Sequence, residues 1–276
     1  MTLREEVVVG DGPSGPVANP LVHAVRTVLP TLFLLLCVAL WQASVVLLHV
    51  STFVLPAPTL IVARIVRSWP EILPNAVVTL QETLVGFALG AVVGFVLALL
   101  IAYSPLFEQM LYPLIVASQA VPKIAVAPLF ILWFGFGIWP KVVVTVLLVF
   151  FPVVVTSAEG LMSVDRSLID LLRSVSANPW QVFVKVRLPH ALPQVLAGLK
   201  IAIALAVVGA VVGEWVGADK GLGYLIIFAN SQLDTTLAFA AITILVIIGV
   251  ALFMAVDLVG RLVTPWHRVR TIDPGM

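Results

Sequence analysis

The sequence predicts an all-α, polytopic membrane protein with about six transmembrane helices, on the basis of its composition and of the length of its apolar segments. Hydrophobic residues make up 61% of the 276 residues and charged residues only 11%, whereas an average soluble domain carries roughly 25% charged residues. A chain with so little polar surface is expected to turn its excess apolar surface toward lipid. No apolar segment shows the sustained alternation that is typical of β-barrel strands.

Six segments are long enough to cross a hydrocarbon core of about 30 Å as helices, since each crossing needs roughly 20 residues. The second segment holds no charged residue between Leu84 and Ala102. In chain order the predicted spans are Val28–Val50, Pro74–Tyr103, Met110–Phe134, Ile138–Thr156, Leu192–Val216 and Leu237–Val263.

The placement of lysine and arginine predicts the orientation, because cytoplasmic loops carry an excess of both. With the N-terminus inside, ten of the fifteen such residues fall on inner segments and four on outer segments, while Lys123 lies within a span. Both termini are therefore expected in the cytoplasm. Residues 1–27 are expected to form a cytoplasmic tail rather than a cleaved signal peptide, residues 28–263 the transmembrane domain and residues 264–276 a second cytoplasmic tail.

The first outer connection begins with Leu55-Pro-Ala-Pro58, where the prolines block continuation of a helix because they lack an amide donor. Residues 59–69 then mix apolar residues with Arg64 and Arg67. This pattern predicts a short interfacial helix on the outer face.

The longest inner connection, residues 159–191, holds most of the inner charge and predicts an amphipathic helix. Asp165 can cap its start, and Pro179 should end it near Asn178. Its apolar positions recur at steps of three, one and three, at Leu168, Leu171, Leu172 and Val175. Two covers for this apolar face remain open from the pattern alone: the membrane surface or the chain's own helices, and a soluble partner subunit.

Small residues recur every four positions in two spans, which lets helix backbones approach closely in lipid. They are Gly86, Gly90 and Gly94 in the second span and Gly209, Gly213 and Gly217 in the fifth. We interpret both rows as helix–helix contacts rather than as a substrate path.

Polar and ionisable residues at membrane depth are costly, so they are candidates for a cavity lining or an internal pair. The set consists of Gln81, Glu82, Gln119, Lys123, Glu159, Glu214 and Asp257. Gln119, Lys123 and Glu214 are the candidates for a translocation path. Lys123 lies between Pro122 and Pro128, which favour local unwinding of that span. A structural ion pair is the alternative role for Lys123.

No motif for catalysis or metal binding is present. The sequence lacks GxxxxGK[ST], HExxH and GxSxG. Its four histidines are scattered, and its single cysteine, Cys37, lies in an apolar run. The formal net charge of +1 disfavours a nucleic-acid partner. We therefore assign no catalytic residue, no metal ligand and no cofactor to this chain.

The inner connection resembles the EAA loop of binding-protein-dependent ABC importer permeases, whose pattern is E-A-A, three residues, G, nine residues, I-x-L-P. Val186-Arg-Leu-Pro189 matches the end of that pattern. Counting back places Asp170 at the Glu position, Leu171 and Leu172 at the two Ala positions, and Ser176 at the Gly position. The change from glycine to serine departs from the family pattern, although Asn178-Pro179 could supply a turn nearby.

Other segments are similar to the nitrate/sulfonate/taurine branch of that family, so the resemblance extends from about Leu55 to Trp266. They are Leu55–Pro58, Val121–Gly137, Pro189–Pro193 with Gly198-Leu-Lys200, Glu214, and Gly221-Leu-Gly-Tyr224.

The resemblance implies a type I ABC importer permease fold in the bacterial plasma (inner) membrane. Two permease chains, in the simplest case a homodimer, would surround one path, and an external solute-binding protein would deliver the solute. The helix within residues 163–178 would dock on one of two ATPase subunits, which hold the ATP and Mg. The docking positions would be Asp170, Leu171, Leu172, Arg173, Val175, Ser176, Ala177 and Asn178.

The resemblance favours a small anionic substrate such as a sulfonate, taurine or nitrate, with a vitamin precursor or related heterocycle as the alternative within the same branch. Two other classes compete with an importer permease. A self-sufficient secondary transporter or channel is disfavoured because no internal repeat is evident. An intramembrane enzyme would need paired catalytic groups, and only scattered candidates occur.

Overall fold

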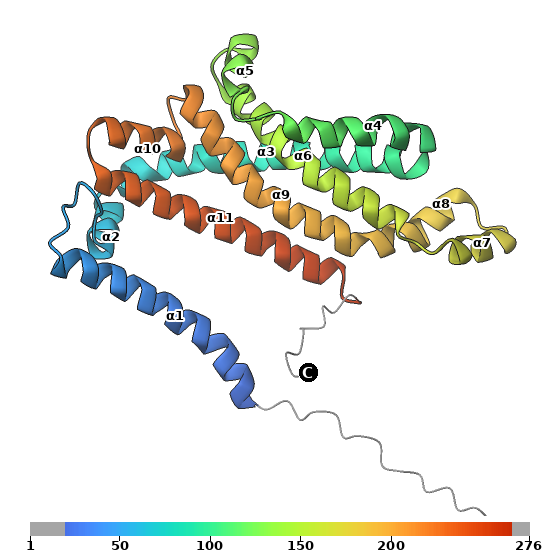
Figure 1. The fold of residues 1–276 in the computed structure, drawn as a ribbon, viewed down its shortest axis with the longest axis horizontal. Helices are drawn as coiled ribbons and strands as arrows, with labels where there is room; N and C mark the ends of the chain where they lie inside the picture. The colour runs from blue at the N-terminus through green and yellow to red at the C-terminus, as the bar shows by residue number, and fades with distance from the viewer. Residues whose placement is uncertain (1–19, 267–276) are drawn as a thin grey trace, which may run out of the picture.

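The computed structural model describes residues 20–266, and every regular element in this range is helical. The elements are α1 (Pro20–Leu47), α2 (Pro58–Arg67), α3 (Trp69–Tyr103), α4 (Pro105–Ala117), η1 (Ser118–Ala120), α5 (Ala127–Phe134), α6 (Ile138–Met162), α7 (Arg166–Ser174), α8 (Pro179–Val182), η2 (Phe183–Arg187), α9 (Leu188–Gly217), α10 (Leu222–Ser231) and α11 (Thr235–Val263). Figure 1 shows α2 and α10 at one end of the bundle and α7 and α8 at the opposite end.

Five helical stretches of the described chain are long and apolar enough to cross a membrane. They are Val28–Leu47, Trp69–Tyr103, Ile138–Met162, Pro179–Gly217 and Thr235–Val263. The first, second, fourth, fifth and sixth predicted spans are therefore confirmed as apolar helices, with ends that shift by several residues.

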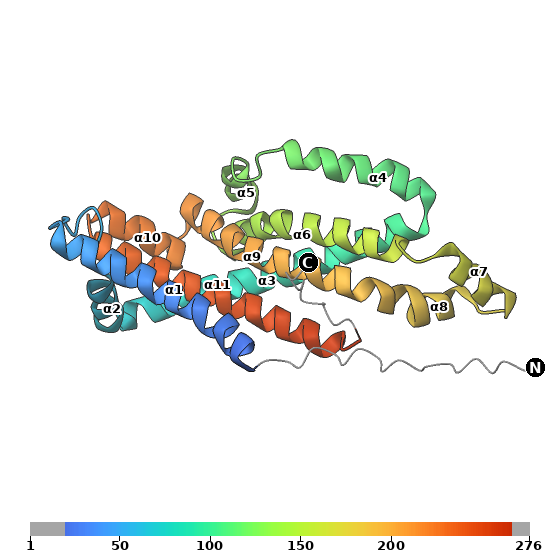
Figure 2. The same ribbon diagram turned by 60° about the horizontal axis from the view of Figure 1, so that its bottom comes forward.

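The third predicted span, Met110–Phe134, is wrong as a single helix. Helix α4 begins earlier, at Pro105, and ends at Ala117, and an irregular segment precedes α5. Val121 is extended (φ −75°, ψ 123°), as expected for a residue before proline. Figure 2 shows α4 running along the bundle and α5 as a separate short helix. The local unwinding predicted around Lys123 is confirmed.

Helix α6 is packed between α3 and α9, and the glycine rows make these contacts possible. A Cβ at Gly86 of α3 would lie 2.4 Å from Cγ2 of Thr145 on α6. A Cβ at Gly209 of α9 would lie 2.7 Å from the Cα of the same threonine. Gly213 likewise faces Lys141 of α6, while Gly217 faces Ile131 of α5. Both rows therefore mark helix–helix contacts, as predicted.

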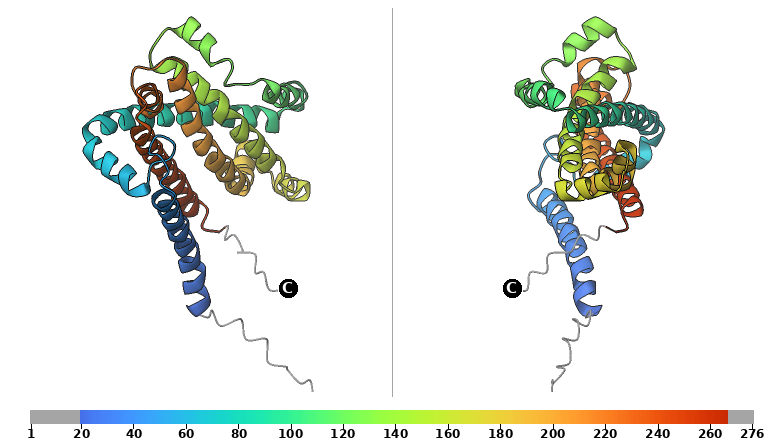
Figure 3. Two further views of the ribbon diagram at one scale, coloured as in Figure 1. Left: turned by 60° about the vertical axis from the view of Figure 1, so that its left-hand side comes forward. Right: turned by 90° about the vertical axis from the view of Figure 1, so that its right-hand side faces the viewer.

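Helix α1 lies beside the bundle rather than within it. Only 6% of its apolar window is buried, and Figures 1 and 3 show it diverging from the other helices toward its N-terminal end. The interfacial helix predicted after it is α2. Arg64 on α2 donates to Asp234, which caps α11, at 2.5 Å, so this ion pair ties α2 to the end of the bundle that carries α10.

Candidate functional site

The inner connection predicted to carry function folds into two short helices and a π-helical turn at one end of the bundle. Asp165 caps α7 as predicted, because its Oδ1 accepts a hydrogen bond from the Ser167 backbone N–H at 2.9 Å. Hydrogen bonding from Ser167 also lowers the pKa of the Asp165 carboxyl. Asn178 caps α8 in a reciprocal pair with Gln181: the Asn178 side chain accepts from the Gln181 backbone at 2.8 Å, and the Gln181 side chain accepts from the Asn178 backbone at 2.9 Å.

Helix α7 ends at Ser174, earlier than the predicted end near Asn178, because Ser176 adopts a left-handed conformation with φ of 60°. The Ser176 N–H donates to the Arg173 carbonyl at 2.9 Å, and the Ala177 N–H donates to the Leu172 carbonyl at 3.0 Å. This pair of bonds is the Schellman helix end, which usually has glycine at the left-handed position. Serine thus preserves the turn at the family's glycine position.

The two sides of α7 differ in what covers them. Ile169 is buried with Val164 and Val182, so this side holds the helix against α8. Leu171 and Val175 are 61% and 69% exposed. Leu168 is also exposed, and Leu172 is half-buried. Of the four apolar positions predicted from the sequence, three therefore form an uncovered apolar face, defined here as Leu168, Leu171 and Val175.

The polar positions of the predicted docking set lie on the surface. Asp170 and Arg173 side chains are each 70% exposed and pair at 3.6 Å across one helical turn. Ser176 and Asn178 are exposed, and Ala177 is half-buried. All eight predicted docking residues therefore lie in one contiguous stretch from α7 to the start of α8.

Gln119 and Lys123, two of the three path candidates, are brought together by the broken segment between α4 and α5. The Lys123 ammonium hydrogen-bonds the Gln119 side-chain carbonyl. Its Nζ also lies 5.4 Å from the ring centroid of Phe151 and 5.9 Å from that of Phe150, both on α6. Within the described residues no carboxylate pairs with Lys123. Its charge is held against aromatic faces on a partly exposed surface of the chain.

Glu214, the third candidate, is buried and does not join that pair. It is 1% exposed and accepts hydrogen bonds from the Thr79 hydroxyl at 2.6 Å and the Gly223 backbone at 2.5 Å. A Cβ at Gly221, where φ is 118°, would lie 2.2 Å from the Glu214 carboxyl carbon. Glu214 therefore fixes the turn from α9 to α10, and only glycine fits opposite it.

A buried ion pair was missed by the sequence reasoning. Lys141 on α6 donates to Glu82 on α3 at 2.6 Å, and their side chains are 6% and 2% exposed. The four lysines and arginines that the charge count assigns to outer segments include Lys141, yet its side chain lies inside the bundle. The costly position of Glu82 at membrane depth was the available signal, and its partner lies 59 residues away in the chain.

Comparison with known proteins identifies the family. Residues 90–269 match the family described as "Binding-protein-dependent transport system inner membrane component". The chain is 41% identical over 240 residues to the formylaminopyrimidine transport permease protein ThiX of Halalkalibacterium halodurans, covering 87% of this chain and 96% of that protein. It is 39% identical over 236 residues to the riboflavin transport system permease protein RibX of Chloroflexus aurantiacus, covering 85% and 88%.

The chain is also similar to proteins named as sulfonate permeases. The putative aliphatic sulfonates transport permease protein SsuC of Bacillus subtilis is 34% identical over 233 residues, with 83% of this chain and 84% of that protein covered. Among solved structures, an inward-facing conformation of the MetNI methionine ABC transporter aligns with a TM-score of 0.61 at 23% identity, covering 70% of this chain and 96% of that chain. This structural match supports the fold.

The family match and the membrane-spanning helices agree with each other. The chain is a multi-pass inner membrane protein, and its family is one of transport permeases rather than enzymes. It therefore belongs to the binding-protein-dependent transport system inner membrane component family, as a type I permease of ABC importers.

Proposed function

We propose that the uncovered apolar face of α7 docks in a cleft of an ATP-binding subunit and couples that subunit to the transport path. The observation that carries this proposal is the exposure of Leu171 and Val175 on a helix that is otherwise anchored through Ile169. Exposed apolar groups on a short helix at the end of a membrane bundle gain most when a protein surface buries them. Asp170, one residue before Leu171, is exposed beside this face and would supply a polar contact at its rim.

The anchoring of α7 supports a rigid transfer of motion. Ile169 packs on Val182, the last residue of α8, and η2 and α9 follow this residue without a break. The His190 side chain at the start of α9 also hydrogen-bonds Ser163, ahead of α7, at 3.1 Å. Closure of two ATPase subunits around ATP would move α7 and α9 together and shift the bundle between its two states. ATP drives this shift through its greater affinity for the closed ATPase pair.

The assembly that follows has two copies of this chain around one path, two ATPase subunits that bind ATP and Mg, and an external solute-binding protein. A homodimer is the simplest closed symmetry for two permease chains. The α7 end of the bundle and both termini lie in the cytoplasm in this arrangement. This chain holds no cofactor of its own.

The path is proposed to run beside Gln119 and Lys123, because these polar groups reach a partly exposed surface at a break in an apolar segment. A cation at this point suits a small anion such as a sulfonate. A planar heterocycle is the second candidate, favoured because the relatives at 41% and 39% identity are named for formylaminopyrimidine and riboflavin. Uptake assays with taurine and with an aminopyrimidine as competing solutes distinguish the two classes.

Coupling is tested by Asp170→Arg in vesicles that contain the whole transporter. The change reverses a charge beside the docking face and should leave the bundle intact, since the Asp170 side chain is 70% exposed and its ion pair within the described residues is with Arg173, one turn away. We expect solute uptake to fall while ATP hydrolysis no longer responds to the loaded binding protein. Normal uptake together with unchanged stimulation of the ATPase would contradict the proposal.

A further inference from the structure

An apolar groove runs from the end of α3 onto α8 and η2. It encloses about 410 Å³ and is lined by Leu99, Leu100, Tyr103, Phe107, Trp180 and Phe183, among others. Leu99 and Leu100 belong to the last turns of a membrane-spanning helix. The groove therefore opens at the depth where the hydrocarbon core ends, and its tyrosine and tryptophan are the residue types that favour a membrane interface.

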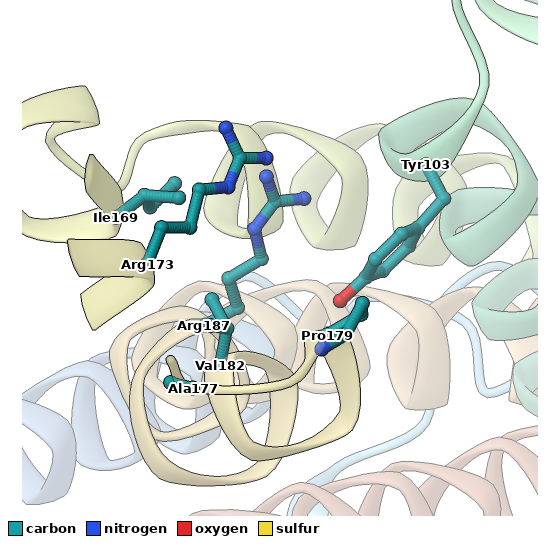
Figure 4. A pocket seen from close by; sticks show the side chains of 7 residues that line it. All are labelled: Tyr103, Ile169, Arg173, Ala177, Pro179, Val182 and Arg187. Carbon is teal, nitrogen blue, oxygen red and sulfur yellow. The ribbon is translucent and has the colours of Figure 1, made fainter. Parts of the chain in front are cut away.

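A basic cavity of about 170 Å³ adjoins this groove, and Tyr103 and Pro179 line both. Arg173 from α7 and Arg187 from η2 also line the cavity, and their side chains extend in the same direction in Figure 4. The Arg187 guanidinium lies 5.0 Å from the ring centroid of Tyr103.

Arg187 keeps its charge available. Within the described residues its guanidinium donates to the Ala102 carbonyl at 3.5 Å, and no carboxylate pairs with it. Glu108 and Arg166 line a second cavity of about 210 Å³ that also borders Arg187. Three arginines and one glutamate thus line these cavities, and Asp170 pairs with Arg173 on the surface of α7. Counted together, these side chains keep a net positive charge.

This cavity lies on a different side of α7 from the docking face. Ile169 and Arg173, one turn apart, turn toward the cavity, whereas Leu168, Leu171 and Val175 form the uncovered side. At 100° per residue the centres of the two sides are separated by roughly 145°. An ATPase bound to the docking face would therefore leave the cavity free.

We propose that the groove and the cavity together bind one anionic phospholipid of the inner leaflet, with its phosphate at Arg187 and Arg173 and an acyl chain in the groove. The combination of an apolar slot open to hydrocarbon and a basic pocket at the interface matches both parts of such a lipid. Arginine pairs bind phosphate oxygens in the planar, two-point geometry that lysine lacks. The proposal rests on the proposed function in one respect, the cytoplasmic position of the α7 end.

The π-helical turn supports a built site. Turns of this kind are rare and occur frequently at functional sites. Here the turn begins with Phe183, which lines the groove, and ends with Arg187, which lines the cavity. One short element therefore supplies a side chain to each half of the site.

Native mass spectrometry of the purified full-length chain in mild detergent tests the proposal, with phosphatidylglycerol and phosphatidylcholine as the added lipids. We expect one phosphatidylglycerol retained per chain and at least fivefold less in Arg187→Gln. Arg187→Lys should retain an intermediate amount, because lysine keeps the charge but not the two-point geometry. Lys185→Gln is the matched control, because Lys185 is exposed in the same turn and lines neither pocket. Ser104→Trp should also lower retention by filling the groove without changing charge.

Three results would overturn the proposal. Equal loss in Arg187→Gln and Lys185→Gln would mean that only general charge attracts the lipid. Displacement of the lipid by soluble glycerol phosphate would indicate a site for a free phosphate compound instead. In a separate pull-down of the complete transporter, loss of the ATPase subunit from Arg187→Gln, with lipid retention on the permease unchanged, would make the ATPase the occupant. Because lipid is measured on the permease alone, failure of ATPase docking and failure of lipid binding are read separately.

Discussion

Replacing Gly209 with alanine should destabilise the bundle, because the new Cβ would lie 2.7 Å from the Cα of Thr145 on α6. This neighbour is a backbone atom, so no side-chain rotation relieves the contact and α9 must move away from α6. Overpacking of this kind costs about 1–3 kcal/mol. The loss of close backbone contact between the helices adds to this cost, since such contacts hold helices together in lipid.

Gly249→Ala is the matched control. A Cβ at Gly249 meets nothing closer than Cγ2 of Val207 at 4.0 Å. Both glycines lie inside long helices, α9 and α11, so both gain about 1 kcal/mol of helix propensity on change to alanine. That gain cancels in the comparison, and the difference of about 1–3 kcal/mol isolates the helix–helix contact.

The assay heats the purified variants in mild detergent and measures the fraction that stays monodisperse. At about 2–4 °C per kcal/mol, Gly209→Ala should melt roughly 2–12 °C below Gly249→Ala. Coincident melting curves for the two variants would refute the conclusion that the glycine row seats α9 directly on α6.

Two further sets of substitutions probe the buried pair and the end of the docking helix. Lys141→Met should lower the free energy of unfolding by about 3–5 kcal/mol, because it leaves Glu82 buried without its cation. The double variant Lys141→Met/Glu82→Gln should melt at a higher temperature than Lys141→Met alone. An equal or lower melting temperature of the double variant would contradict the pairing. Ser176→Gly should stabilise the loop by up to about 1 kcal/mol and Ser176→Val should weaken it, because φ is 60° at this position. Limited proteolysis compares the rates at which the loop is cleaved in these variants. Slower cleavage of Ser176→Val than of Ser176→Gly would contradict the left-handed turn at this position.

The spans could be predicted from the sequence where one long apolar run forms one continuous helix, as in α3 and α11. In the third span the prolines predicted local unwinding, but not that the break would end α4 at Ala117 and leave α5 as a separate helix. The composition of a segment indicates its affinity for lipid, whereas a break in a helix depends on single residues such as a proline, which lacks the backbone N–H donor.

The docking loop was predictable in part. The Asp165 cap follows from a local rule, but the end of α7 depends on a serine in a conformation that glycine usually adopts. Both Leu168 and Ile169 are apolar neighbours in sequence, and only packing on Val182 determines that Ile169 is the buried one. The Glu82–Lys141 pair joins distant helices, so no local pattern could reveal it.

The docking of α7 on an ATPase subunit is tested most directly by a pull-down of the tagged chain in mild detergent, followed by mass spectrometry and an ATPase assay. Leu171→Asp places a charge in the centre of the exposed apolar face, and Leu171→Met keeps that face apolar at similar volume. We expect a stoichiometric ATP-binding subunit with the unaltered chain and with Leu171→Met, and none with Leu171→Asp. Recovery of the chain alone, with transport in vesicles that follows an ion gradient without ATP, would contradict the account.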